Sequence, residues 1–285
     1  TPVFPRGEYQ CGPAGLATLL VASGVDVTPA ALAPEVFIPG REGSLTLELI
    51  GATRRHDRLP YVLATTAHEM IAELEAGRPV LVLQNLGTEV LPQWHYAVLI
   101  GYDAGRNVAI LRSGREARLE MKWQRFAGSW HRGGRFALTT LPPGVIPAHA
   151  EPVRYLEAAA GLEAAGRRQA AAESYDAAVA RWPEEPLAWL GRGNVAFADG
   201  QHEESAEAYV RAIRLAPENA AARNNLAELL LDAGCVAESR RQVERAYALA
   251  AGTVLETAVA DSRARIEGAA LAARDCPLQG FDWPD

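Results

Sequence analysis

The sequence of 285 residues contains no apolar run as long as the roughly 18 residues that indicate a membrane-spanning helix. It has one lysine against 27 arginines, and neither half of the chain carries a stripe of basic residues. Proteins that bind nucleic acid through its phosphates need such a stripe, so nucleic acid is not expected as the main partner. The six histidines are scattered without metal-ligand spacing. The sequence therefore predicts no metal site and no cofactor.

Acidic residues are concentrated in the second half of the chain. Residues 1–150 carry 14 basic and 13 acidic side chains, whereas residues 151–285 carry 14 and 22. The sequence pattern also differs between the two halves. Since 285 residues are enough for two domains with cores of their own, we expect one domain in each half.

Residues 1–142 are predicted to form short helices first and an antiparallel sheet afterwards, which is an α+β pattern. Helix starts are indicated at Thr28, at Ser44, and at Thr66, where Glu69 would complete a capping box. Apolar, β-rich runs predict strands at 79–83, 95–102, 108–111 and 135–141, with a turn at 103–106. A segment rich in proline and glycine follows, and we interpret residues 143–151 as a linker.

Residues 152–285 are predicted to be all-α, because a 34-residue period runs through them. The pattern has a bulky residue first, a glycine midway, an alanine in the second helix and a proline at the end. It resembles the tetratricopeptide repeat, with three copies and a final capping helix over about 254–273. The resemblance implies a concave surface that binds a protein or peptide partner. The recurring positions are Tyr155, Gly166, Tyr175, Ala178 and Pro183, and then Trp189, Gly200, Tyr209, Ala212 and Pro217.

Cys11 directly precedes an apolar helical pattern and is the main candidate for chemistry. Gly12 and Pro13 suit the start of a helix, and the leucines that follow give it a buried face up to Gly24. A thiol at a helix N-terminus is close to the positive end of the helix dipole, which favours the nucleophilic thiolate. His95 opens a later strand-like run. An early helical cysteine and a later strand-borne histidine follow the order of papain-like thiol enzymes.

The first half also resembles the bacteriocin-processing cysteine peptidases of the double-glycine-leader type, including a bacterial subgroup with tetratricopeptide repeats behind the peptidase domain. The similarity rests on three motifs, at residues 10–14, at 79–83, and at 95–98 with 101–102. It implies a papain-like cysteine peptidase domain over residues 1–142 and a peptide or protein substrate. It further implies Cys11 as nucleophile, His95 as base, and cleavage after small residues such as Gly-Gly.

Two positions depart from the pattern of that family. Where the family has a glutamine that helps to form the oxyanion hole, this chain has Arg6, and Gln10 is a second oxyanion candidate. Where the family has an aspartate that orients the histidine, pairing of the predicted hairpin brings Arg112-Ser113-Gly114 opposite His95. No carboxylate is available there, so the expected orienting group is Ser113 or a backbone carbonyl.

Other groups near the expected site are open to more than one interpretation. Gln84 and Asn85, which leave the neighbouring strand, are further orienting candidates for the histidine. Trp94 and Tyr96 are candidates for the substrate cleft, although most of the aromatic residues in this half are expected in the core. Two alternative functions remain: a catalytically weak or inactive peptidase-like module that binds peptides, and a thiol-dependent acyl transferase.

The two remaining cysteines and the start of the chain bear on its location. Cys235 and Cys276 border helices that should be antiparallel, so they form either a disulfide or two unpaired thiols.

The sequence begins at Thr1 without a methionine, and we expect that an N-terminal segment has been removed. The resemblance implies an export signal and an extracytoplasmic protein, periplasmic or lipoprotein-anchored, with membrane contact only through that removed segment. The residues themselves leave a cytoplasmic location open.

Overall fold

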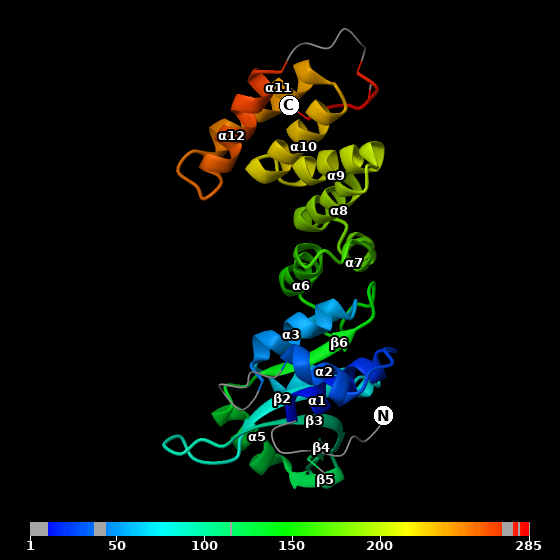
Figure 1. Ribbon diagram of the computed structural model, residues 1–285, viewed down its shortest axis with the longest axis vertical. Helices are drawn as coiled ribbons and strands as arrows, with labels where there is room; N and C mark the ends of the chain where they lie inside the picture. The colour runs from blue at the N-terminus through cyan, green and yellow to red at the C-terminus, as the bar shows by residue number, and fades with distance from the viewer. Residues whose placement is uncertain (1–10, 37–43, 115, 270–275, 279, 285) are drawn as a thin grey trace. The chain divides into compact units, whose positions relative to one another are not determined.

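The computed structural model describes residues 11–36, 44–114, 116–269, 276–278 and 280–284. Its packing divides the chain into two compact units, Thr1–Ala170 and Ala171–Asp285. The first unit is α+β and the second is all-α, which confirms the predicted fold classes (Figure 1). None of the described helices combines the length and the apolar composition that crossing a membrane requires.

The first unit contains a six-stranded antiparallel sheet. Its order is β1-β6-β2-β3-β4-β5, so the apolar strands β2 and β3 are inside the sheet. Pairing of β2 with β3 places Gln84 opposite His95 and Asn85 opposite Trp94. The strands are β1 (Leu59–Val62), β2 (Val80–Asn85), β3 (Trp94–Asp103), β4 (Val108–Ser113), β5 (Glu116–Lys122) and β6 (Ala137–Leu141).

Helices cover both faces of this sheet. Three of them, α1 (Cys11–Ala22), α2 (Pro29–Val36) and α3 (Thr46–Arg55), share one buried cluster with the central strands. That cluster contains Leu81, Tyr96 and Val98, which lie on one face because side chains alternate along a strand. Helix α5 (Trp123–Arg132) covers the opposite face, where Ser129 meets Gln84 of β2. The central strands are thus held on both sides, as Figure 1 shows.

The predicted helices and strands of this unit are present, but the sequence analysis missed three elements. Strand β1 is only four residues long and contains Pro60, and β5 is a polar strand at the edge of the sheet. Helix α5 lies between two predicted strands, in a stretch to which no element was assigned, although it buries Phe126 and Trp130. Weak apolar alternation hides short or edge strands from pattern analysis.

The capping box expected at Thr66 is not formed. Helix α4 (Ala67–Glu75), which packs on β2 and β3, does have Thr66 at its N-cap, but the threonine side chain makes no capping hydrogen bond. Glu69 instead accepts a hydrogen bond from the Ala64 N–H at 2.7 Å and binds Arg154. A glutamate completes a capping box only if its carboxylate is not already hydrogen-bonded to other groups.

Helix α6 (Pro152–Ala164), which the repeat pattern assigns to the second half, packs with the first unit. Arg154 makes two parallel hydrogen bonds to the Glu69 carboxylate, at 2.9 and 2.7 Å. The guanidinium also lies over the ring of Tyr61, whose hydroxyl accepts a hydrogen bond from the Glu151 N–H. This start of the first repeat is thereby attached to β1 and α4.

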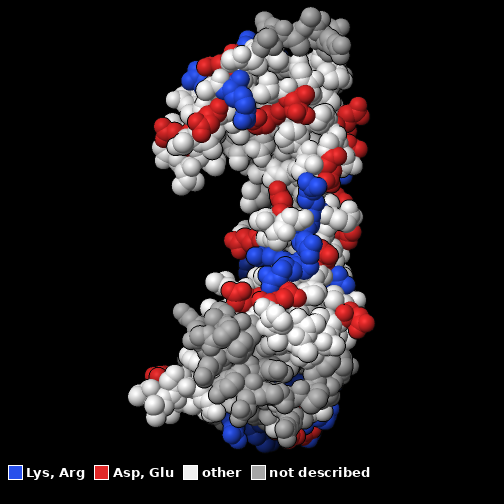
Figure 2. All heavy atoms as spheres, viewed as in Figure 1, with Lys and Arg blue, Asp and Glu red and all other residues white. Residues whose placement is uncertain are grey.

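The second unit is built from consecutive helices joined by tight turns. Gly200 and Gly234 lie in these turns with φ of +74° and +80°, a backbone conformation that strongly favours glycine. The helices pack through a cluster centred on Tyr209 and Ile213, and basic and acidic side chains are mixed on the outside (Figure 2). The helices are α7 (Arg168–Arg181), which crosses the boundary between the units, α8 (Pro186–Ala198), α9 (His202–Leu215), α10 (Ala220–Asp232), α11 (Val236–Ala250) and α12 (Glu256–Glu267).

A disulfide joins Cys235 to Cys276, which resolves one of the alternatives left open by the sequence. It fixes the C-terminal segment against the helices. Leu278, Phe281 and Trp283 of that segment join the cluster around Tyr209. The predicted capping helix is present as α12, and its expected last residues, 270–273, lie outside the described part of the chain.

Candidate active site

Cys11 is the first residue of α1 and is half-buried against the core of the first unit. The helix begins two residues before Pro13, which the sequence analysis took as its first position. Proline is tolerated throughout a first turn, because the first N–H groups of a helix have no acceptor within it. Because these N–H groups have no acceptor within the helix, they and the helix dipole can stabilise negative charge on a thiolate or an oxyanion at this turn.

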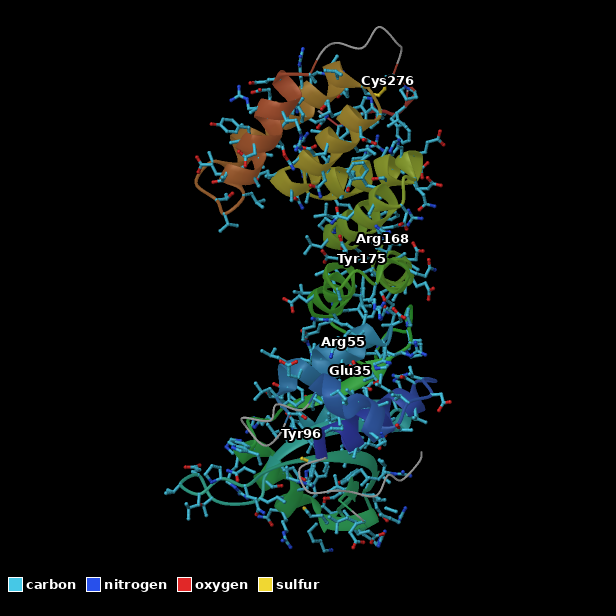
Figure 3. The ribbon with its side chains drawn as sticks, in the orientation of Figure 1. Glu35, Arg55, Tyr96, Arg168, Tyr175 and Cys276 are labelled. Carbon is cyan, nitrogen blue, oxygen red and sulfur yellow. A yellow bond between two sulfur atoms is a disulfide. The ribbon has the colours of Figure 1, made fainter. Side chains whose placement is uncertain are left out.

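Helix α1 packs against β3 and β2. A Cβ atom on Gly15 would come within 2.5 Å of Leu81 and 3.7 Å of Val98, so the helix crosses the sheet closely at this point. Burial raises the pKa of Tyr96 well above its usual range, and negative charge on Cys11 adds to the shift. Tyr96, labelled in Figure 3 beside α1, is therefore an electrostatic neighbour of the thiol.

His95 is half-buried next to Tyr96 and makes a hydrogen bond to the following strand. Its Nε2 atom lies 2.8 Å from the Oγ atom of Ser113, the last residue of β4. The pairing of β3 with β4 places Val98 opposite Arg112, so Ser113 is diagonal to His95 on the same face of the sheet. A hydroxyl thus holds the imidazole at the place where the resemblance leads us to expect a carboxylate.

The other two orienting candidates are bonded elsewhere. The Gln84 amide donates to Ser129 Oγ at 2.7 Å, and Ser129 in turn donates to a carbonyl of its own helix. The Asn85 carbonyl accepts hydrogen bonds from the N–H groups of Gly87 and Gln93. Both side chains are buried and hold neighbouring segments, so Ser113 is the candidate that the structure brings to His95.

The remaining predicted site residues are placed as follows. The oxyanion candidates Arg6 and Gln10 lie outside the described residues. Of the two cleft candidates, Tyr96 is buried under α1, whereas 58% of Trp94 is exposed at the start of β3. Because side chains alternate along β3, both rings lie on the face that carries α1, while His95 points to the other face at the same end. No group of three or more metal-ligating side chains occurs among the described residues.

Ser44 is a neighbour of the site that the sequence pattern did not indicate. A Cβ atom on Gly12 would lie 2.5 Å from Ser44 Oγ, so the glycine is needed for the segment before α3 to pass the first turn of α1. Gly12 and Ser44 are 32 positions apart in the sequence, so no local sequence pattern predicts their contact. Ser44 therefore helps to fix the position of the turn that carries Cys11.

Comparison with known protein families identifies two parts of the chain. The model of the Peptidase_C39 like family matches residues 2–138. The tetratricopeptide repeat model matches residues 156–217 and again 196–253. A comparison with curated proteins found no match to this chain.

Two solved structures illustrate the two parts. A structure described as a C39-like peptidase from Bacillus anthracis has 18% identity and a TM-score of 0.41, covering 48% of this chain and 91% of that chain. The type III secretion chaperone SycD from Yersinia enterocolitica, in complex with a peptide of the translocator YopD, has 21% identity and a TM-score of 0.38. It covers 40% of this chain and 91% of that chain. The chain thus contains a Peptidase_C39-like domain over residues 2–138, followed by tetratricopeptide repeats over residues 156–253.

Proposed function

We propose that the chain is a cysteine peptidase in which Cys11 is the nucleophile and His95 the general base. The observation that carries this proposal is the 2.8 Å hydrogen bond between His95 Nε2 and Ser113 Oγ, which orients the imidazole at the start of β3. When Ser113 Oγ accepts a hydrogen bond from Nε2–H, the lone pair of the neutral ring is on Nδ1. We propose that Cys11 and the ring meet around the start of β3, past the end of the sheet, where Nδ1 takes the proton of Cys11.

The reaction would proceed through a thioester. The Cys11 thiolate attacks the carbonyl carbon of the scissile peptide, and the imidazolium of His95 gives its proton to the leaving amine. Water then hydrolyses the thioester, and the thiol is restored. The N–H of Cys11 in the first turn of α1 is available to the oxyanion, with Arg6 or Gln10 as further donors. From the resemblance we propose cleavage after small residues such as Gly-Gly.

A peptide-binding module with little activity is the second candidate function, because His95 is held by a neutral hydroxyl. A hydroxyl stabilises an imidazolium less than a carboxylate does. The acyl transferase alternative shares the thioester with the peptidase and differs only in the acceptor. Added amines that intercept the acyl-enzyme would identify it.

The repeats and the disulfide support two further proposals. We propose that the tetratricopeptide repeats bind a protein or peptide partner, which is the usual role of such arrays. We also propose an extracytoplasmic location. The disulfide between Cys235 and Cys276 supports it, because structural disulfides persist in oxidising compartments.

Labelling with a thiol electrophile tests the proposed pair. Iodoacetamide would be reacted over pH 5–9 with the wild type, Cys11→Ala and His95→Ala, and the modified residue identified by mass spectrometry. We expect rapid labelling of Cys11 near neutral pH that is lost in His95→Ala. Labelling that rises only at alkaline pH, as for an ordinary free thiol, and that is unchanged in His95→Ala would contradict the peptidase and favour the binding module.

A further inference from the structure

The loop between β2 and β3 exposes a cluster of large apolar side chains beside the candidate site. Val90 is 87% exposed and Leu91 78%, and Leu86 and Trp94 at its two ends are also exposed. Figure 1 shows this loop extending away from the sheet, and Figure 2 shows the projection as largely uncharged. Single exposed apolar residues are common on protein surfaces, but clusters of this kind mark binding surfaces.

The loop has a fixed shape, because the buried side chain of Asn85 closes it. Its carbonyl accepts from the N–H groups of Gly87 and Gln93, and its amide donates to the Thr88 carbonyl. Thr88 also exchanges hydrogen bonds with Leu91 at the tip. Gly87 is required, since a Cβ atom there would lie 2.2 Å from the Leu91 carbonyl oxygen. The apolar tip is therefore presented by an ordered backbone and loses little entropy on binding.

The position of the loop relates it to the proposed chemistry. Trp94 directly precedes His95 and pairs across the sheet with Asn85, which anchors the loop. Val90 and Leu91 are four to five residues from His95 along the chain. At about 3.3 Å per residue, the tip is at most about 16 Å from the candidate base. An extended peptide covers that distance with about five residues.

We propose that residues 86–94 form an apolar surface that binds an extended peptide substrate. The surface contacts an apolar side chain of that peptide three to five residues from the scissile bond. This inference rests on the proposed peptidase function. A peptide is favoured over a lipid surface because Glu89 is the one charged residue of the segment. Segments that bind membranes combine apolar residues with lysine or arginine, and residues 86–94 contain neither.

A leucine scan tests this surface without depending on catalysis. Fluorescein-labelled serine-rich peptides with a central Gly-Gly would carry a single leucine at successive positions, up to six residues on either side. Their affinity for the full chain with Cys11→Ala would be measured by fluorescence anisotropy. We expect leucine three to five residues from Gly-Gly to raise the affinity about tenfold over the peptide without leucine. Elsewhere it should have little effect.

The same scan with loop variants assigns the effect to residues. Val90→Ser together with Leu91→Ser should abolish the leucine preference, and Trp94→Ala should weaken it. The matched control Val254→Ser, which removes a still more exposed valine from the second unit, should retain it. Because all of these side chains are exposed, the variants should fold, which circular dichroism checks.

The outcomes separate this inference from the proposed function. A leucine preference that depends on the loop supports the surface, even if the wild type hydrolyses none of the peptides. Hydrolysis by the wild type with no leucine preference, or with a preference that survives Val90→Ser and Leu91→Ser, overturns the surface and leaves the peptidase intact. Co-sedimentation with phosphatidylcholine vesicles that needs Val90 and Leu91, without any peptide preference, also overturns it.

Discussion

Ser113 Oγ lies 2.8 Å from His95 Nε2 and takes the place at which the resemblance leads us to expect an aspartate. A neutral hydrogen bond of this kind contributes about 1 kcal/mol, and a charged partner contributes roughly twice as much. We therefore expect Ser113→Ala to slow labelling of Cys11 at neutral pH by up to tenfold and Ser113→Thr to restore it. Equal rates in Ser113→Ala and the wild type would show that the hydroxyl does not position the ring.

The reverse substitution tests the same contact. A carboxylate beside His95 stabilises the imidazolium, which should extend the thiolate–imidazolium pair to higher pH. Ser113→Asp is expected to accelerate Cys11 labelling and to move the alkaline limb of the pH–rate profile upward. A profile that does not shift would contradict a role of this position in the ionisation of His95.

The close approach of Gly12 and Ser44 yields a second prediction. The Cβ atom of Gly12→Ala would come 2.5 Å from Ser44 Oγ and 2.7 Å from its Cβ atom, so the first turn of α1 must shift. We expect this overpacking to lower the free energy of unfolding by about 1–3 kcal/mol and to slow Cys11 labelling. Thermal unfolding and labelling rates measure both effects.

A compensating variant makes this prediction specific. Ser44→Gly combined with Gly12→Ala removes the clash and should recover most of the lost stability and labelling. Gly105→Ala is the control, because its Cβ atom would meet only Asp103 Oδ1 at 3.6 Å. Failure of Ser44→Gly to rescue would mean that Gly12 is required for another reason.

The sequence predicted those parts of the fold and site that depend on local pattern. The repeats were recognisable because turns such as those at Gly200 and Gly234 need positive φ at a fixed period. Ser113 could be proposed because a hairpin sets which residues of two adjacent strands meet. The bulge between Leu99 and Gly101 shifts the register, yet Ser113 stays within reach of His95.

Contacts between distant segments could not be predicted in this way. No local sequence pattern indicates that Gly12 and Ser44 lie close together. The same holds for the ion pair between Glu69 and Arg154, which are 85 residues apart. The capping box expected at Thr66 is absent because Glu69 binds Arg154 instead. Asn85 was considered as a partner of His95 because of its position, but its side chain closes the loop that follows it.

The ion pair of Glu69 and Arg154 predicts a pH dependence of stability. Burial raises the pKa of Glu69, but hydrogen bonds from Arg154 and the Ala64 N–H outweigh it and hold the pKa below its ordinary value. A carboxyl with a lowered pKa stabilises the folded state above its unfolded pKa of about 4.3. That stability is lost as the pH falls through the lower pKa of the folded protein. Thermal unfolding between pH 3 and 7 should show this loss, and Glu69→Gln should reduce it.

Removing the arginine tests the same pair at neutral pH. Arg154→Ala leaves a buried carboxylate without its main partner and should lower the free energy of unfolding by about 3 kcal/mol. The control Arg118→Ala removes an exposed arginine from the edge strand β5 and should cost less than about 1 kcal/mol. Similar losses in the two variants would show that the bidentate contact adds nothing to the stability of this unit.

The disulfide between Cys235 and Cys276 should stabilise the second unit by restricting its unfolded chain. The two cysteines are 41 residues apart, and closing a loop of that length corresponds to about 4 kcal/mol of chain entropy. Guanidinium unfolding with and without reductant measures the difference. Reduction should also release Phe281 and Trp283 from the cluster around Tyr209, which tryptophan fluorescence can follow.

Counting thiols distinguishes this disulfide from two free cysteines. Of the 3 cysteines in the chain, one should react in the unreduced, unfolded wild type, and none in Cys11→Ala. All three should react in the wild type after reduction. Cys276→Ala should match the stability of the reduced wild type and be insensitive to reductant, because it lacks the same covalent constraint. Three reactive thiols without reductant would show that the bond does not form, and the support it gives to an extracytoplasmic location would be lost.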